Sequence, residues 1–138
     1  MPKESMLQFH NYVVDEIRFQ NLPDMNAPRQ YQLHPHFKRT TTALEHGQYD
    51  VTLTVEISSS EADPAPFALF ISMTGRFSLL EAESLDPEVK AAILKNNTAA
   101  ILFPYLRAAV STVISSANLP ALLLPVMSFQ DEGSEDTM

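Results

Sequence analysis

Two histidines and a pair of neighbouring carboxylates are the side chains of this sequence that could carry metal or acid–base chemistry. His34 and His36 flank a proline, but two imidazoles without a third ligand nearby make a poor metal site. Asp15 and Glu16 are adjacent, yet neighbours on a strand point to opposite faces, so they cannot share one proton. The three glycines form no phosphate-binding loop, and the sequence contains no nucleophile elbow. We therefore expect no enzyme site, no metal and no cofactor.

Length and charge narrow the class of protein further. A chain of 138 residues gives room for one domain with a real core. Seventeen acidic against nine basic residues leave a net charge of -8, which argues against nucleic acid as a partner. The chain has no cysteine, and its first residues lack the apolar run of a signal peptide. No stretch approaches the ~20 apolar residues of a membrane span. We expect a cytoplasmic protein.

The segment from Ile101 to Asn118 is apolar on nearly every face, and a helix of this kind needs more than one partner. Pro104 lacks an amide hydrogen, so we expect the helix to begin near Leu102 with Pro104 in its first turn. Bulky residues would face the chain's own sheet. Small residues at helical spacing would face a second copy, and these are Ala108, Ala109, Ser111, Thr112 and Ser115. The prediction is a dimer or a dimer of dimers, and the alternative is a plain core helix in a monomer.

The start of this segment carries a resemblance to a known family. Ile101-Leu102-Phe103-Pro104-Tyr105, followed by Arg107, resembles the signature that opens the long helix of SecB, the bacterial export chaperone. Weaker matches are Asn26-Ala27-Pro28 in a loop and Gly75 to Leu79 at the end of a strand. SecB proteins usually continue into a second amphipathic helix that covers part of the substrate groove. That helix is missing from this sequence, so we expect a more open groove or one covered by another subunit.

The pattern of the whole chain predicts four strands before two helices. Apolar and polar residues alternate from Tyr49 to Ser58, as in a strand with one buried face, and Asp86-Pro87-Glu88 is a helix-start signal. The other predicted strands are Leu7 to Leu22 with a bulge near Val13-Val14, Leu33 to Leu44, and Phe67 to Leu79. We expect an α+β fold, a four-stranded antiparallel meander packed by a short and a long helix, as in SecB. It would form a single domain over residues 1–129, with a disordered acidic tail over residues 130–138.

Apolar residues in loop-like positions favour a binding function, although each could instead fill the core. The predicted peptide groove consists of Leu33, Phe37, Leu122, Leu123, Leu124, Val126 and Met127. The resemblance implies a holdase, which keeps unfolded polypeptides or preproteins competent for export and uses no nucleotide.

The resemblance also implies a contact with the export motor SecA through acidic residues on the outer face of the sheet. The corresponding positions are Glu16, Gln20 and Phe70, and only Glu16 is charged. The alternative is a SecB-like chaperone dedicated to another client, such as the antitoxin of a toxin–antitoxin pair. A third hypothesis, a small-molecule-binding α+β domain or enzyme, would need a closed pocket with convergent polar groups.

Overall fold

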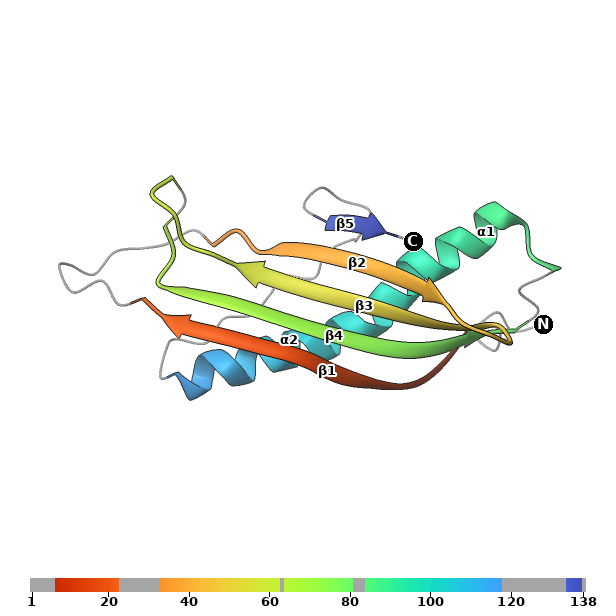
Figure 1. Ribbon diagram of the computed structural model, residues 1–138, viewed down its shortest axis with the longest axis horizontal. Coiled ribbons are helices and arrows are strands. Elements are labelled where there is room, and N and C mark those ends of the chain that lie inside the picture. Colours follow the sequence, from red (N-terminus) through yellow and green to blue (C-terminus); the bar gives the residue numbers. More distant parts are fainter. Residues whose placement is uncertain (1–6, 23–32, 63, 81–83, 118–133, 138) are drawn as a thin grey trace.

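A computed structural model describes residues 7–22, 33–62, 64–80, 84–117 and 134–137. Four antiparallel strands form a sheet, and a long helical segment lies across one face of it (Figure 1). The strands are β1 (Leu7–Asn21), β2 (His36–Ala43), β3 (Gln48–Ile57) and β4 (Phe67–Leu79), and the helical segment consists of α1 (Pro87–Ala92), η3 (Ile93–Asn97) and α2 (Thr98–Ser116). The predicted α+β fold with a four-stranded antiparallel sheet is confirmed.

The order of the strands differs from the predicted meander. β2, β3 and β4 follow one another as neighbours, but β1 pairs with β4 and lies at the far edge of the sheet. The meander prediction rests on the tendency of consecutive strands to pair. The long connection between Asn21 and His36 removes that constraint, because it can pass from one edge of the sheet to the other. β1 shifts register at two bulges, between Phe9 and Asn11 and between Val14 and Glu16, so the predicted bulge is confirmed to within a residue.

β3 and β4 supply most of the core. Their odd-numbered residues point toward the helix and are buried, whereas the even-numbered ones lie on the solvent face. α2 packs on this layer with four residues at a spacing of four, which puts them on one side of the helix: Leu102, Leu106, Val110 and Ile114. The bulky side of α2 thus faces the sheet, as the sequence predicts.

Gly75 on β4 allows α2 to approach the sheet closely. A Cβ atom at this position would lie 2.6 Å from Cδ2 of Leu102, which is nearer than two carbon atoms can pack. Leu102 is fully buried, so it has little room to move aside. The absence of a side chain at Gly75 therefore sets the distance between helix and strand.

The helical segment is longer and less interrupted than the sequence predicts, although it starts at the predicted place. Asp86 caps it, since its carboxylate accepts a hydrogen bond from the amide of Glu88 at 3.1 Å. The predicted break between a short and a long helix is absent, because a π-helical turn, η3, joins α1 to α2 without interruption. Pro104 consequently lies inside α2 and not in its first turn. The carbonyl of Ala100, four residues earlier, loses its amide partner, and Ala100 is exposed, so water can take that place.

Four residues of the predicted acidic tail are described by the structure. Ser134–Thr137 forms a short strand, β5, which pairs parallel with β2 (Figure 1). The rest of the predicted acidic tail, residues 130–133 and 138, lies outside the described residues. An edge strand provides backbone donors and acceptors for any segment that can reach it, whatever the polarity of that segment.

Candidate functional site

The predicted groove is described by the structure only in part. Leu122, Leu123, Leu124, Val126 and Met127 lie outside the described residues. Leu33 is half-buried and packs against the edge of the core. Phe37 is only 2% exposed, and its ring meets that of Phe103 edge to face, with centroids 5.6 Å apart. Phe37 is thus a core residue in this structure, because β2 turns its odd-numbered side chains toward the helix.

A continuous apolar surface lies instead along the seam between β1 and α2. Tyr12, Val14 and Ile17 pair with inward-facing residues of β4, so they point to the helix side of the sheet. α2 does not cover them, and Ile17 remains 49% exposed. Tyr105 of α2 completes the surface, with its ring centroid 4.6 Å from that of Tyr12. We call these four residues the β1–α2 surface.

The small residues of α2 extend this surface. Ala108, Thr112 and Ser115 are exposed, and they follow Tyr105 at helical spacing. Ala109, by contrast, packs against the edge of the core, and Ser111 is half-buried. Beyond them an open hollow of about 500 Å³ lies between the ends of β1 and α2, lined by Phe19, Asn21, Thr112, Val113, Ser116 and Ala117. A strip of apolar and small side chains therefore runs the length of this seam.

The sequence predicts that small residues of the long helix face outward, but it does not predict that the apolar residues of β1 are exposed. Tyr12, Val14 and Ile17 look like core residues, because their apolar character and strand spacing are those of a buried face. They are exposed because β1 is an edge strand, and the edge position follows from the strand order.

The opposite face of the sheet holds the three positions predicted for a motor contact. Glu16, Gln20 and Phe70 lie on adjacent strands, since Gln20 pairs with Ala68 and Arg18 with Phe70. Arg18 sits among them. Its guanidinium lies 4.5 Å from the centroid of the Phe70 ring, and its Nε is 2.7 Å from Oε2 of Glu16. The one acidic residue of this patch is thus paired within the chain, which reduces its attraction for a basic partner.

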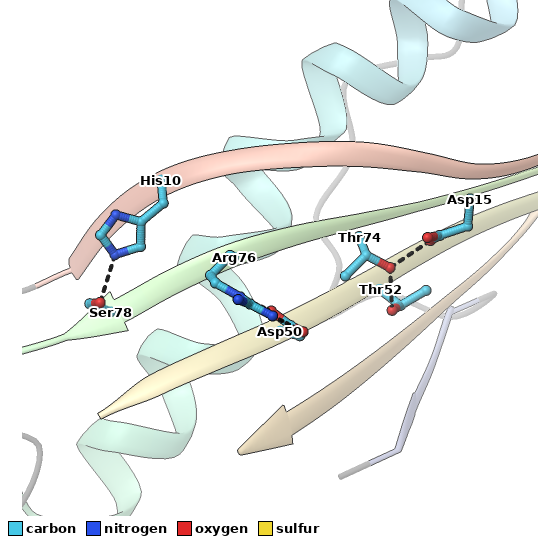
Figure 2. A network of polar contacts seen from close by, with 7 residues as sticks. All are labelled: His10, Asp15, Asp50, Thr52, Thr74, Arg76 and Ser78. Carbon is cyan, nitrogen blue, oxygen red and sulfur yellow. Dashed lines mark hydrogen bonds and ion pairs between the residues drawn. The ribbon is translucent and has the colours of Figure 1, made fainter. Parts of the chain in front are cut away.

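A row of polar contacts crosses the same outer face (Figure 2). Thr74 donates a hydrogen bond to Oδ2 of Asp15 at 2.6 Å, so its hydroxyl must accept the bond from Thr52 at 2.8 Å. The guanidinium of Arg76 donates one hydrogen bond to each carboxylate oxygen of Asp50, at 2.8 and 2.9 Å. The hydrogen bonds from Arg76 hold the pKa of Asp50 below its usual range.

These polar groups pair with one another across neighbouring strands, so their role is to hold the strands together. Nε2 of His10 lies 2.6 Å from the hydroxyl of Ser78, at an exposed site on the same face. In the described part of the chain no three His, Cys, Asp or Glu residues come close enough to hold a metal ion. His34 and His36 are both exposed.

The helical segment Pro87–Ser116 is long and apolar enough, by length and composition, to cross a membrane. The sequence predicts two separate helices over this segment, neither of them long enough to span a membrane. Core helices pass the same test, and the buried side chains of α2 pack on the sheet as those of a core helix do. The hydropathy of this segment is explained by the fold itself.

The fold is that of an α+β domain with an apolar strip along one edge of its sheet. Residues 5–131 match the family model described as "Preprotein translocase subunit SecB". The chain belongs to the SecB family.

Individual relatives agree with this assignment. The protein-export protein SecB of Methylobacillus flagellatus is 30% identical over 90 residues, which cover 65% of this chain and 55% of that protein. SecB of Anaplasma phagocytophilum is 37% identical over 81 residues, which cover 59% and 51%. The match thus spans about half the length of these two relatives. An uncharacterised protein of Methanocaldococcus jannaschii, MJ0357, is 29% identical over 90% of this chain and 80% of its own.

A solved structure shares the fold. The Mycobacterium tuberculosis SecB-like chaperone Rv1957, in complex with a ChAD peptide from the HigA1 antitoxin, aligns with a TM-score of 0.73. The alignment covers 91% of this chain and 93% of that one, at 15% identity. At this identity the likeness concerns the fold alone.

Proposed function

We propose that this chain is a holdase chaperone, which binds unfolded polypeptides through apolar surface and carries out no chemistry. The observation that carries the proposal is the apolar strip along the seam of β1 and α2, in which the four apolar side chains of the β1–α2 surface are 37% to 49% exposed and an open hollow of about 500 Å³ lies at one end. Contiguous apolar surface of this kind marks a binding site in a soluble protein. Membership of the SecB family supports the same function, because its members are chaperones and not enzymes.

Binding would depend on the burial of apolar client side chains. Each Å² removed from water contributes about 25 cal/mol, and the association needs no nucleotide. A protein that binds only the unfolded form of a client keeps it unfolded by mass action. The proposed groove combines the hollow at the ends of β1 and α2 with Leu33 and with Leu122, Leu123, Leu124, Val126 and Met127.

Two kinds of client are compatible with these surfaces. The first is a preprotein that is kept competent for export and handed to SecA. The second is a dedicated client such as an antitoxin, as in the Rv1957 complex. The ion pair between Arg18 and Glu16 favours the second, because it neutralises the one acidic position left for a SecA contact.

The assembly that we propose is a homo-oligomer, a dimer or a homotetramer built as a dimer of dimers. Ala108, Thr112 and Ser115 lie on the exposed side of α2 and would let a second helix approach closely. The SecB family supports a cytoplasmic location for the protein. Its net charge of -8 is unfavourable for binding nucleic acid.

An aggregation assay tests the holdase proposal. A chemically unfolded client is diluted into buffer with the chain, and light scattering is followed. We expect the chain to suppress scattering, and the double variant Leu33→Ser, Leu123→Ser to suppress it several-fold less at a nearly unchanged melting temperature. If the variant instead melts far lower and keeps its activity per folded molecule, these leucines belong to the core, since a buried Leu costs about 2 to 5 kcal/mol to remove.

A capture experiment with the same protein distinguishes the two kinds of client. SecA and a synthetic antitoxin peptide are offered in parallel to the immobilised chain. Capture of SecA would support the export function, and capture of the peptide alone would support a dedicated chaperone.

A further inference from the structure

The helical segment changes its winding at η3, the π turn between α1 and α2. In a π turn the backbone amides bond to carbonyls five residues back and not four, so the turn is wider than an α-helical one. Positions four apart in an α-helix drift by about 40° around the axis, because one turn contains 3.6 residues. Leu94, Thr98 and Leu102 are nevertheless all buried. The wide turn takes back part of the drift and keeps Leu94 directed inward.

The side chain of Thr98 supports this register of the helix. In an α-helix the amide of Thr98 would bond to the carbonyl of Leu94, whereas in a π turn it reaches one residue further back. The hydroxyl of Thr98 donates to the Leu94 carbonyl instead, at 2.6 Å, and the whole side chain is buried. An α-helical register would satisfy that carbonyl from the backbone and would not need the hydroxyl. Thr98 is thus a positioning residue for the π register.

The π register closes a small apolar cluster that is separate from the main core. Leu94 packs there with Tyr49 of β3 and Leu79 of β4, and all three side chains are buried. We call these three residues the end cluster. Leu80, next to Leu79, is already exposed. If Leu94 turned away, Tyr49 and Leu79 would lose a cover, and the apolar surface at this end of the sheet would grow.

The part of the helical segment before α2 is weakly held. Among residues 87–92, all of which the structure describes, none is buried. The ammonium group of Lys90 lies 5.7 Å from the centroid of the Tyr49 ring, close to the ~6 Å limit of a cation–π contact. In η3, Oδ1 of Asn96 is buried and accepts no hydrogen bond within the described part of the chain, which costs free energy. Figure 1 shows α1 at the end of the helical segment, outside the outline of the sheet in this view. Weakly packed segments of this kind open more readily than the core.

We propose that η3 is a hinge with two registers, and that residues 87–97 form a latch over the end cluster. In the π register Leu94 closes the cluster. In the α-helical register Leu94 turns away, and Tyr49 and Leu79 join Leu80 in an apolar patch that receives unfolded client segments. The inference rests on the proposed holdase function and adds to it a surface that is hidden until a client binds. A client that binds only the open register shifts the chain toward it.

Labelling of a buried thiol measures the opening. The chain contains no cysteine, so a single introduced thiol reports its own exposure. Leu79→Cys places the thiol in the end cluster, and Ile71→Cys places it in the main core as a matched control. Iodoacetamide is added to each folded variant, and mass spectrometry follows the modification. We expect the thiol at position 79 to react at least tenfold faster, and equal rates would overturn the latch.

Two substitutions of Thr98 test the hinge in the Leu79→Cys background. Thr98→Val keeps the shape and removes the hydroxyl, so it should favour the α-helical register and speed the labelling several-fold. Thr98→Ser keeps the hydroxyl and should label at the parent rate. In the Ile71→Cys background, Thr98→Val should leave the rate unchanged. Equal rates for all Thr98 variants, as for simple fraying of the end of β4, would overturn the hinge. A rise at both thiols would mean general unfolding and would overturn it too.

A pair of neighbouring asparagines tests the link between the latch and client binding. Asn96→Leu removes the buried Oδ1, so it should stabilise the closed register and slow the labelling at position 79 several-fold. It should also reduce the suppression of client aggregation per folded molecule. Asn97→Leu makes the same change at an exposed position of the same turn and should alter neither measurement. Equal effects of the two substitutions would overturn the role of Asn96 in the latch.

The aggregation assay separates this inference from the proposed function. A parent chain that suppresses aggregation as well as both Asn96→Leu and Thr98→Val do would overturn the client role of the latch and leave the holdase standing. A parent chain that protects no unfolded client would overturn the holdase function, and with it the use of the end cluster by clients.

Discussion

At the scale of single residues, Gly75 determines how closely helix and sheet can pack. We predict that Gly75→Ala destabilises the protein by about 1 to 3 kcal/mol, the usual cost of forcing extra volume into a packed core. The added Cβ would lie 2.6 Å from a methyl carbon of Leu102, so one of the two elements must move. Denaturant unfolding followed by circular dichroism measures the change.

A double variant shows whether Leu102 is the obstacle. Leu102→Val removes volume opposite Gly75, so Gly75→Ala should cost less in that background than in the parent chain. Strictly additive losses would mean that the strain at Gly75 arises elsewhere, for example against the Phe77 ring at 3.1 Å.

The pair formed by Asp50 and Arg76 makes stability depend on pH. The pKa of Asp50 is lowered in the folded state by its hydrogen bonds to Arg76, so folding favours the ionised form. This contribution is fully present above the pKa of an unfolded aspartate and disappears as the pH falls through the lower folded value. Asp50→Asn should therefore lower the melting temperature slightly at pH 7, and the difference from the parent should close as the pH falls through the lowered pKa of Asp50. A difference that grows on acidification would contradict this pairing.

At the scale of elements, the exposed side of α2 is the predicted oligomer contact. We predict that Ala108→Arg and Ser115→Arg dissociate the assembly, since each would bury a long charged side chain without a partner. Both positions are exposed within one chain, so the fold should tolerate the change. Ala109 is less suitable, because it packs against the core. Light scattering coupled to gel filtration gives the mass.

Ala91→Arg is the matched control for this experiment. Ala91 is also an exposed helical alanine, but it lies on α1, away from the small-residue stripe. The control should keep the parent mass. If all three variants keep it, another surface holds the copies together, and the exposed edge of β1 is the next to test.

A strand or a helix could be predicted from the sequence where the pattern that defines it involves only residues close together in the chain. Alternation in β3 and β4 and the cap at Asp86 depend on near neighbours, and the structure confirms them. The pairing of β1 with β4 and the pairing of β5 with β2 join segments far apart in the chain, and no local pattern encodes them. The exposure of Ile17 and the burial of Phe37 follow from that order, which is why the predicted groove and the observed apolar strip differ.

At the scale of the whole molecule, the proposed client binding and the proposed assembly would compete for the same apolar strip. Tyr12, Val14 and Ile17 on β1 and the small residues of α2 lie along one seam, so a second copy and a client cannot both cover the same part of it. The hollow lined by Phe19 and Val113 lies at one end of that seam. We therefore predict that the middle of the strip joins copies and that the end near the hollow receives clients.

The variant Val14→Ser, Ile17→Ser distinguishes these uses of the seam. Both side chains are more than 40% exposed, so their loss should cost far less stability than the ~2 to 5 kcal/mol of a buried leucine. We predict a lower mass in solution, because the middle of the strip would lose the apolar area that joins two copies, with an unchanged melting temperature of the single chain. Val113→Ser, at the hollow but also packed against the core, should lower the melting temperature somewhat, keep the mass and reduce the suppression of client aggregation per folded molecule several-fold. The opposite pairing, with mass changed by Val113→Ser and client binding changed by Val14→Ser, Ile17→Ser, would exchange the two assignments along the seam.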